Sequence, residues 1–417
     1  MIYEKLSPKQ LDLIFWWRRE ETKNFDAVIC DGAVRSGKTL AMTVGFVLWS
    51  CTNFANENFA FCGKTIESLR RNVIEPMNKW LEGIVEIRSG GGRNFVDISA
   101  KNRTNRYYFF GGKDENSYKS IQGATLAGVM LDEVVLMPKN FVEQAISRCS
   151  VRGSRFWLNC NPDNPEHWFY KEWVLRAEEK NVLRLKFSME DNFSLSAEVR
   201  ERYKRLYSGV FYDRYIRGEW ISADGLVYDM FDKKVNVINK IPETEGDFYV
   251  SADFGIQNAT VFLLWRREKC PENRWICLDE WYYSGRESRR QKTVGELCEH
   301  LSRWLGDVKP KCVYIDPSAV ALIEECKRGG FCVKSAKNNV MNGISDVSTM
   351  LANGSLVFSD RCVHTIEEFG EYVWDEKATR NGADVPVKNN DHCLDAVRYF
   401  VNSLDLMKKR YKFITKF

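Results

Sequence analysis

The octapeptide Gly32–Thr39 constrains the fold more strongly than any other feature of the chain. Its sequence, Gly-Ala-Val-Arg-Ser-Gly-Lys-Thr, fits the pattern G-x-x-x-x-G-K-[ST] at every fixed position. The apolar run Ala27–Cys30 precedes it, and the helix-forming run Leu40–Trp49 follows it. A loop between a strand and a helix can turn its backbone N–H groups toward phosphate oxygens. The pattern therefore predicts an α/β P-loop NTPase domain, in which helices flank a mostly parallel sheet.

The residue types inside this loop predict how it binds ATP. Gly32 and Gly37 let the backbone turn and approach the phosphates closely. Lys38 is expected to reach the β- and γ-phosphates, and the Thr39 hydroxyl to ligate Mg²⁺, with Ser36 in the same cradle. A chance match in a glycine-containing loop is the alternative, which the flanking strand and helix disfavour.

A cation that meets the charge developing on the γ-phosphate would assist hydrolysis. Arg35, inside the loop itself, is the best candidate for this role within the chain. Lys119, Arg148 and Arg152 are weaker candidates that could act from a neighbouring subunit. A solvated surface position is the commoner fate of such residues.

An acidic partner for the P-loop follows a second buried strand. The apolar run Ala127–Leu131 leads directly into Asp132 and Glu133. Asp132 is expected to hold Mg²⁺ through water, and Glu133 to orient and deprotonate the water that attacks the γ-phosphate. That role favours hydrolysis over transfer to a substrate hydroxyl. A strand that ends in a solvated acidic turn is the alternative.

The third apolar strand, Phe156–Asn159, ends in amides. Asn159 or Asn161, placed beside a γ-phosphate, could sense its presence and couple hydrolysis to movement. The cluster Asn161–Pro165 also fits a simple turn, and the two interpretations stay open.

Gln10 has two interpretations as well. It could contact the adenine of ATP. Ser7, Pro8 and Gln10 also have the spacing of a capping box that opens a helix, which is the safer interpretation.

The length of 417 residues predicts two or three domains. We expect an ATPase domain over 1–225 with a helical linker or lid at about 165–225, a linker over 226–240, and a second domain over 241–417 with a basic tail, Lys408–Phe417. The charged segment Ser196–Gly209 is expected to be helical. The expected strands are Ala27–Cys30, Phe59–Cys62, Tyr107–Phe110, Ala127–Leu131, Phe156–Asn159, Phe248–Ala252, Val261–Trp265, Trp275–Leu278, Val313–Ile315 and Leu356–Phe358.

Composition excludes several classes of protein. Lys and Arg total 61 and Asp and Glu total 57, so the net charge of +4 does not by itself indicate a nucleic-acid binder. The longest apolar stretch, Ala41–Trp49, is far shorter than the ~20 residues that span a bilayer. Met1–Lys5 lacks a signal-peptide pattern, so we expect an intracellular protein that is neither secreted nor membrane-bound. The 13 cysteines show no C-x-x-C spacing, which argues against zinc sites and a disulfide framework.

Acidic residues at strand ends mark a second candidate site. Asp253 ends an alternating strand, and Asp316 ends a buried one. Asp391, His392 and Asp395 open a C-terminal helix and border one of its faces. Carboxylates from separate strands and a helix can hold two divalent cations ~4 Å apart, Mg²⁺ or Mn²⁺, which is the arrangement used in phosphodiester cleavage. Each acid alone fits ordinary capping, but the set in strand, strand, helix order predicts a metal-dependent nuclease site.

Other residues near this site are weaker candidates. Glu280, which follows the strand Trp275–Leu278, could add a ligand. A set of basic residues could follow a phosphate backbone without reading bases, although a solvated face explains them equally well. These residues are Arg286, Arg289, Arg290, Lys292, Lys334 and Lys337.

An ATPase half followed by an RNase H-like half resembles the large terminase subunit of tailed bacteriophages. The residues that carry the resemblance span about 5 to 405 in the family's order. They are Gly32–Thr39, Leu131–Glu133, Gly218–Trp220, Asp253–Gly255, Ile315–Pro317 and Asp391–Tyr399.

The resemblance implies a motor that uses ATP to move double-stranded viral DNA into a procapsid, and an endonuclease that cuts the concatemer. By the same resemblance Lys38, Thr39, Asp132 and Glu133 carry ATP hydrolysis. Asp253, Asp316 and Asp395 ligate the nuclease metals, assisted by His392 or Asp391. The implied partners are a small terminase subunit and the portal protein. A pentameric ring during packaging, a monomer in isolation and a location in the cytoplasm of the infected bacterial host are also implied.

The chain departs from the family at one position. Many relatives have Arg-Gly shortly before the acidic strand, whereas this chain has Gln122-Gly123. A trans-acting arginine at that position is therefore not expected, and Lys119 or Arg35 would have to supply the charge.

Two alternatives stand beside the motor-and-nuclease hypothesis. One is a P-loop DNA translocase whose C-terminal half only binds or docks. The other is a small-molecule phosphotransferase, against which the position of Glu133 directly after Asp132 argues.

Overall fold

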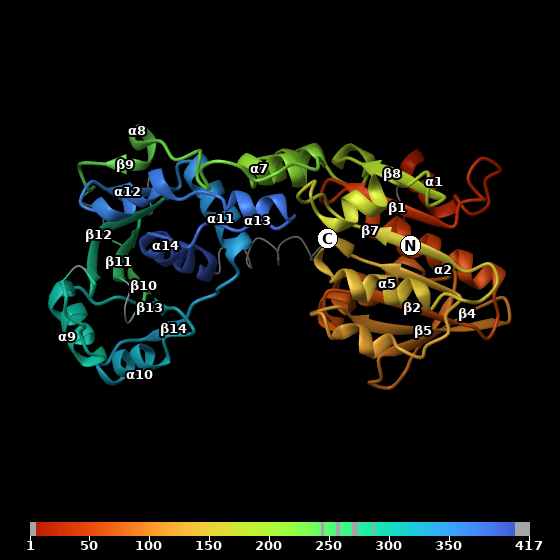
Figure 1. The fold of residues 1–417 in the computed structure, drawn as a ribbon, viewed down its shortest axis with the longest axis horizontal. Helices are drawn as coiled ribbons and strands as arrows, with labels where there is room; N and C mark the ends of the chain where they lie inside the picture. The colour runs from red at the N-terminus through yellow and green to blue at the C-terminus, as the bar shows by residue number, and fades with distance from the viewer. Residues whose placement is uncertain (1–5, 243–245, 256–258, 269–273, 287, 405–417) are drawn as a thin grey trace. The chain divides into compact units, whose positions relative to one another are not determined.

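The computed structural model describes residues 6–242, 246–255, 259–268, 274–286 and 288–404, so the predicted basic tail lies outside the described residues. The chain divides into two compact units. The first comprises the chain up to Lys204 together with Val210–Ser222 and Thr379–Ala383. The second comprises Arg205–Gly209, Ala223–Ala378 and the chain from Asp384 onward. Figure 1 colours each unit by residue number.

The first unit is built on an eight-stranded sheet. From β5 to β8 neighbouring strands run parallel, whereas β3, β4 and β5 pair antiparallel. Because parallel strands end at the same edge, the segments that follow β1, β6 and β7 lie close together. The strands, in sheet order, are β3 (Glu86–Ser89), β4 (Phe95–Ala100), β5 (Arg103–Gly111), β2 (Asn58–Gly63), β6 (Gly128–Leu131), β7 (Arg155–Asn159), β1 (Ala27–Gly32) and β8 (Val182–Phe187).

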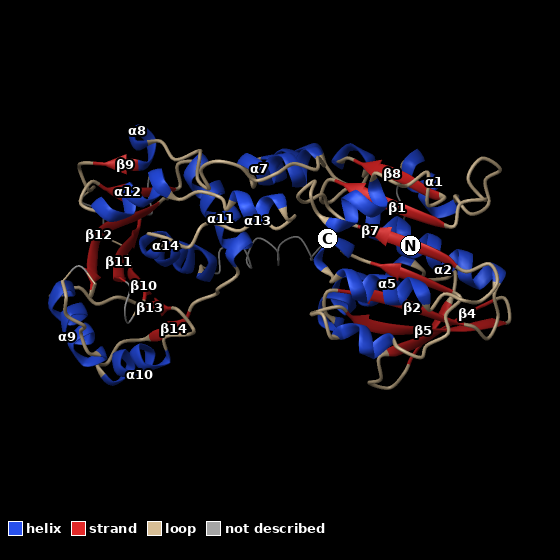
Figure 2. Cartoon of the chain, viewed as in Figure 1, coloured by secondary structure: helices blue, strands red, loops and turns tan. Residues whose placement is uncertain are grey.

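Apolar side chains fill both faces of this sheet, as expected for a sheet buried between helices. Val28 and Cys30 of β1 join one core with α2, while Ala27 and Ile29 join the opposite core with α5. Figure 2 shows the helices around the sheet. The helices along this part of the chain are α1 (Pro8–Phe15), α2 (Lys38–Asn53), α3 (Ile66–Leu69), η1 (Arg70–Ile74), α4 (Glu75–Trp80), η2 (Ser117–Ile121), η3 (Val134–Leu136), α5 (Lys139–Ser147), η4 (Tyr170–Val174), η5 (Met189–Asp191), α6 (Ala197–Lys204), α7 (Gly209–Tyr212) and η6 (Asp213–Arg217).

The second unit has a seven-stranded mixed sheet. Strands β10, β11 and β12 pair antiparallel, and the flanking strands pair parallel. In sheet order the strands are β14 (Val333–Ser335), β13 (Cys312–Ile315), β10 (Phe248–Asp253), β11 (Ala259–Arg267), β12 (Trp275–Ser284), β15 (Leu356–Ser359) and β9 (Val237–Ile238). The helices are α8 (Lys233–Asn236), α9 (Val294–Leu305), α10 (Val320–Arg328), α11 (Val340–Ala352), α12 (Val363–Glu371), α13 (Glu376–Arg380) and α14 (His392–Ser403).

Different helices cover the two faces of this sheet. Val250 and Ala252 of β10 pack in the core formed with α9 and α10. Helix α14 covers the opposite face and contacts β10, β11 and β13 (Figure 1). There the ring of Phe400 stacks on Trp265 with centroids 4.3 Å apart. Since side chains alternate along a strand, Ser251 and Asp253 face α14.

The structure differs from the sequence prediction in three connecting segments. The lid at about 165–225 is not wholly helical, because Val182–Phe187 forms β8 and pairs with β1. The predicted helix Ser196–Gly209 is shorter and ends at Lys204. The predicted linker 226–240 contains α8 and β9, and β9 pairs with β15 in the second sheet. Among the helices that the structure describes, none is long and apolar enough to cross a membrane.

Candidate active sites

The predicted phosphate loop joins β1 to α2. Strand β1 ends at Gly32, and α2 begins at Lys38. A Cβ atom on Gly32 would lie 1.9 Å from the Phe187 carbonyl oxygen, and Gly37 has a φ of 82°. Both positions therefore require glycine, since a side chain would clash or strain the backbone.

Lys38 lies inside the loop with its ammonium against backbone oxygens. Its Nζ atom donates to the carbonyl oxygens of Gly32 at 3.0 Å and Ala33 at 2.7 Å. It also donates to Ser36 Oγ at 3.2 Å and to Asn161 Oδ1 at 3.1 Å. Burial lowers the pKa of Lys38 to about 8. Asn161, one of the two amides predicted to lie beside the γ-phosphate, thus contacts the P-loop lysine.

Three side chains from three elements meet beside the loop. Thr39 Oγ1 donates to Asp132 Oδ1 at 3.2 Å. Asn159 Nδ2 donates to Asp132 Oδ1 at 2.6 Å and to Thr39 Oγ1 at 2.9 Å. Burial raises the pKa of Asp132, while these two hydrogen bonds oppose the rise. Asn159 Oδ1 is buried and accepts no hydrogen bond from any described residue. Hydroxyl, carboxylate and amide oxygens are ligands that Mg²⁺ accepts, so the residues present fit this cation.

Glu133 follows this cluster in an uncommon backbone conformation. Its φ of 58° lies in the left-handed region, which a non-glycine residue rarely adopts without a structural demand. Burial and the neighbouring charge of Asp132 raise the pKa of Glu133 to about 7. A carboxylate with such a pKa is suited to accept a proton near neutral pH.

Gln10 lies where both of its interpretations can hold. Its Oε1 atom accepts from the Ser7 backbone N–H at 2.9 Å, and Ser7 Oγ accepts from the Gln10 N–H at 3.2 Å, which completes the capping box. A Cβ on Gly37 would come within 2.2 Å of Gln10 Nε2, so the amide rests on the P-loop. The adenine contact stays a prediction.

Arg35 is exposed and points toward the lid helix α6. Its Nε atom donates to the Tyr203 hydroxyl at 2.8 Å, and its guanidinium lies 5.6 Å from the centre of that ring. Asn192 Nδ2 donates to the Arg35 carbonyl oxygen at 2.8 Å. The role of Arg35 at the γ-phosphate stays a prediction, as do the roles of Lys119, Arg148 and Arg152.

Sequence reasoning missed a hydrogen-bonded group behind the loop. Asp31 is fully buried and accepts from Arg184 Nη2 at 2.7 Å and from Trp220 Nε1 at 2.8 Å. Gly218 packs against Gly32. The connector Gly218–Trp220 is therefore attached to the strand that carries the P-loop. The sequence signal for Asp31 was an acidic residue at the end of an apolar strand, directly before the loop.

The second site begins at two neighbouring strand ends. Strands β10 and β13 pair parallel, with Ala252 opposite Ile315, so Asp253 and Asp316 follow at the same edge of the sheet. Both face α14, because Val250 and Ile315 face the opposite core. Tyr399 of α14 donates from its hydroxyl to Asp316 Oδ2 at 3.1 Å.

Helix α14 brings the remaining predicted residues to the same place. His392 Nδ1 lies 2.9 Å from Asp253 Oδ2, and this contact raises the pKa of His392. Burial raises the pKa of Asp253, and the charges of Asp395 and Asp316 raise it further. The charges of the other two acidic residues thus act on Asp253.

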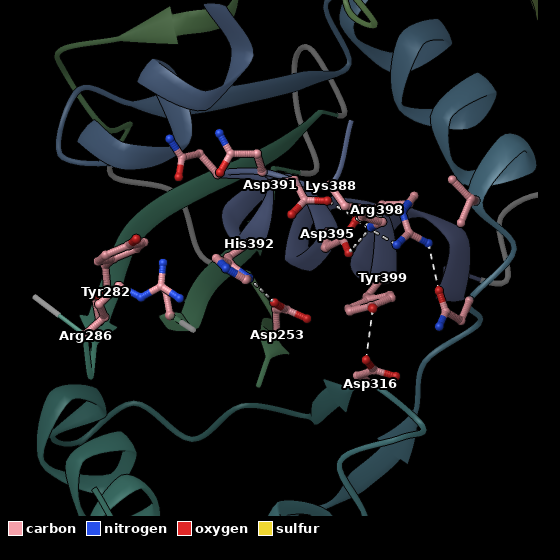
Figure 3. Close-up of a pocket in the computed structure, with 16 residues that line it drawn as sticks. Asp253, Tyr282, Arg286, Asp316, Lys388, Asp391, His392, Asp395, Arg398 and Tyr399 are labelled. Carbon is pink, nitrogen blue, oxygen red and sulfur yellow. Dashed lines mark hydrogen bonds and ion pairs between the residues drawn. The ribbon is translucent and has the colours of Figure 1, made fainter. Parts of the chain in front are cut away.

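All five predicted ligands of the nuclease site line one cavity of about 490 Å³. Figure 3 shows Asp253, Asp316 and Asp395 around it, with His392 beside Asp253 and Tyr399 beside Asp316. Within the described chain, no three His, Cys, Asp or Glu side chains form a preassembled metal cluster. Basic groups contact Asp395 instead, with Lys388 on Oδ2 and Arg398 on Oδ1. The hard oxygen donors that line the shared cavity are of the type that divalent cations prefer.

Glu280 has a structural position instead of a place in this cavity. Its carboxylate accepts from the backbone N–H groups of His364 at 2.7 Å and Thr365 at 3.0 Å. It also contacts His364 Nδ1 and the Thr365 hydroxyl, both at 2.8 Å. The side chain anchors the start of α12, where N–H groups lack helical partners. Glu280 is not among the residues that line the cavity with the other predicted ligands.

We expect the Glu280→Ala variant to be less stable than the native chain and to retain its activities. Removing the carboxylate leaves the α12 N–H groups without an acceptor, which costs about 2 kcal/mol of unfolding free energy. Urea unfolding followed by circular dichroism measures this loss. Glu299→Ala, which removes an exposed carboxylate paired with Arg303 on α9, is the matched control and should change stability by less than ~0.5 kcal/mol. Equal stabilities of the two variants would contradict the anchoring role.

The basic residues that were predicted to follow a phosphate backbone have different surroundings in the structure. Arg286 lines the cavity. Arg290 pairs with Glu296, and Lys292 Nζ lies 2.5 Å from His300 Nε2. Roles for these residues and for Arg289, Lys334 and Lys337 stay predictions.

Family models match the chain twice, as "Terminase large subunit, T4likevirus-type, N-terminal" over residues 29–234 and as "Terminase RNAseH like domain" over residues 317–403. The large terminase from a thermophilic bacteriophage is similar at 45% identity, with a TM-score of 0.90, over 96% of this chain and 99% of that one. The chain belongs to the large terminase family.

Further solved structures of that thermophilic-phage large terminase contain nucleotides. Its complex with ADP matches at 45% identity and TM-score 0.89, over 96% of this chain and 100% of that one. Its complex with ATP-γ-S matches at 44% identity and TM-score 0.87, over 96% and 99%. A comparison with curated proteins gives no match.

Family membership confirms the predicted fold class and the predicted kind of function. This large terminase chain combines an ATPase domain with an RNase H-like domain of nuclease type, and its function is that of the motor and nuclease of phage DNA packaging. The alternative of a C-terminal half that only binds or docks is not favoured, because the matched model is that of a terminase RNase H-like domain.

Proposed function

We propose that the first unit hydrolyses ATP to drive double-stranded DNA into a procapsid, and that the second unit cuts concatemeric DNA as a two-metal endonuclease. The observation that carries the second part is that Asp253, Asp316, Asp391, His392 and Asp395 line a single cavity. The nucleotide complexes of the thermophilic-phage relative support ATP as the ligand of the P-loop.

In the proposed ATPase site each residue has a defined task. Lys38 exchanges its carbonyl acceptors for β- and γ-phosphate oxygens. Thr39 and Asp132, held together by Asn159, would hold Mg²⁺, which supplies positive charge beside the phosphates when bound. Glu133 accepts a proton from the attacking water. Asn161 accepts a hydrogen bond from Lys38, so it would respond when the lysine changes its hydrogen-bond partners.

In the proposed nuclease site Asp253, Asp316 and Asp395 would hold two divalent cations, Mg²⁺ or Mn²⁺. Such ions, when bound, activate water and stabilise the leaving oxygen of a phosphodiester. His392 keeps Asp253 oriented through their 2.9 Å contact. Asp391 is the N-cap residue of α14 and lines the cavity. Arg286, which also lines the cavity, would offer its positive charge to a DNA phosphate.

We further propose partners and a location from family membership. The small terminase subunit and the portal protein of the procapsid would be the protein partners. A homo-oligomeric ring, pentameric during packaging, would form on the portal in the cytoplasm of the infected bacterial host. The lid and connector, over about 165–225, would transmit ATP turnover to the second domain.

Plasmid cleavage tests the proposal most simply. The full chain should nick and linearise supercoiled plasmid when Mn²⁺ or Mg²⁺ is added. EDTA should stop cleavage, and an excess of the same metal should restore it, which controls for damage to the protein. Absence of cleavage with either metal, in a preparation whose ATP turnover is stimulated by double-stranded DNA, would instead support a binding module.

A further inference from the structure

The ammonium group of Lys388 lies between two of the acidic side chains of the second cavity. Its Nζ atom donates to Asp391 Oδ2 at 2.9 Å and to Asp395 Oδ2 at 3.0 Å. Figure 3 shows Lys388 beside both carboxylates at the cavity. A positive charge of this chain thus occupies the space where two acidic oxygens converge.

The other oxygen of Asp395 is held from inside the protein. Arg398 Nη2 donates to Asp395 Oδ1 at 2.7 Å, and Arg398 Nε donates to it at 3.3 Å. The Arg398 side chain is only 2% exposed, and its Nη1 atom is fixed on Asn338 Oδ1 at 3.0 Å. This buried contact leaves Oδ2 as the oxygen that Asp395 can offer to a ligand in the cavity.

Lys388 differs from Arg398 because its ammonium group can move away from Asp395. Its side chain is 57% exposed, so the ammonium can move into water without uncovering the core. The single charge of an exposed lysine attracts these oxygens less strongly than the double charge of a divalent cation at the same place.

We propose that Lys388 is an internal counter-ion that competes with divalent cations for Asp391 and Asp395. The inference rests on the proposed nuclease function and adds a positioning residue to it. Lys388 holds the acidic residues together when no cation is bound, and a cation must displace its ammonium before Asp395 Oδ2 becomes a ligand. Metal affinity is lowered accordingly, so cutting requires a higher cation concentration than the carboxylates alone would need.

Equilibrium binding of Mn²⁺ to the full chain tests this competition without any cleavage assay. Free Mn²⁺ is measured by electron paramagnetic resonance, and the sites lost in Asp253→Asn define binding at the cavity. Lys388→Met should bind Mn²⁺ at these sites about fivefold to tenfold more tightly, because the competing charge is gone. Lys388→Arg retains the charge and should stay within about twofold of the native chain. Lys327→Ala removes an exposed lysine of α10 that pairs with Glu324 and is the matched control.

The outcomes separate this inference from the proposed function. Tighter binding in Lys388→Met, with native-like binding in Lys388→Arg and Lys327→Ala, supports it. Equal affinity of the native chain and Lys388→Met at sites that Asp253→Asn removes would overturn the role of Lys388 and leave the nuclease proposal standing. Mn²⁺ binding that Asp253→Asn does not change would overturn the proposed metal site itself. Melting temperatures in EDTA give a second readout, in which Lys388→Met should melt below Lys388→Arg and regain the difference when Mn²⁺ is added.

Discussion

The Glu133→Gln variant is expected to turn over ATP about a thousandfold more slowly than the native chain, with ATP affinity within about threefold of native. The amide preserves the size and hydrogen-bonding shape of the side chain but cannot accept a proton. The hydrogen bonds that hold Lys38 and Thr39 in the loop go to other groups, such as the Gly32 carbonyl oxygen and Asp132. Nucleotide binding should therefore survive the substitution.

Phosphate release and fluorescent-nucleotide titration measure the two quantities for Glu133→Gln. Glu143→Gln is the matched control, since Glu143 is an exposed glutamate on α5 that pairs with Lys139. Turnover in Glu133→Gln above about one tenth of the native rate would reject Glu133 as the base. Loss of nucleotide binding would show that the side chain shapes the pocket instead.

The second large effect concerns the nuclease cavity. Asp253→Asn and Asp395→Asn should each reduce metal-dependent plasmid cleavage at least about a hundredfold, because a neutral amide binds a hard divalent cation far more weakly than a carboxylate does. ATP turnover should be unchanged, since both residues lie in the second unit. Gel analysis of supercoiled plasmid over time measures cleavage.

Asp307→Asn is the matched control for these two substitutions, because Asp307 is exposed and lies outside the cavity. It should cut as the native chain does. Full cleavage by Asp253→Asn and Asp395→Asn would contradict the assignment of the cavity. Addition of excess Mn²⁺ should restore little activity to either variant, unlike the restoration expected after EDTA treatment of the native chain.

Sequence patterns predicted the buried parts of the fold well. Every apolar run that was expected to form a strand overlaps a strand in the structure, for example Ala27–Cys30 within β1 and Val313–Ile315 within β13. Strands buried on both faces have continuous apolar sequences, so their pattern survives without knowledge of neighbours. Strands at the edges were missed for two reasons. One or both faces of β3 and β8 carry polar side chains, and β9 has only two residues, too few for a pattern.

The candidate sites were predictable to a different extent. Strand-end acids such as Asp253 and Asp316 could be placed at one edge, because parallel strands end together. Glu280 could not be separated from them, since its partner α12 comes from a distant part of the sequence. Lys388 and Arg398 were missed because a pattern of acidic ligands does not indicate which charges neutralise them. For Arg398 the available signal was its helical spacing three residues after Asp395, whereas Lys388 precedes the helix.

Two separate hydrolytic centres in one chain should fail independently of each other. ATP turnover and plasmid cleavage are therefore measured side by side in Glu133→Gln and Asp253→Asn. We expect crossed losses, in which the first variant cuts DNA without consuming ATP and the second consumes ATP without cutting. A single substitution that removes both activities, or a pair that removes neither, would contradict it.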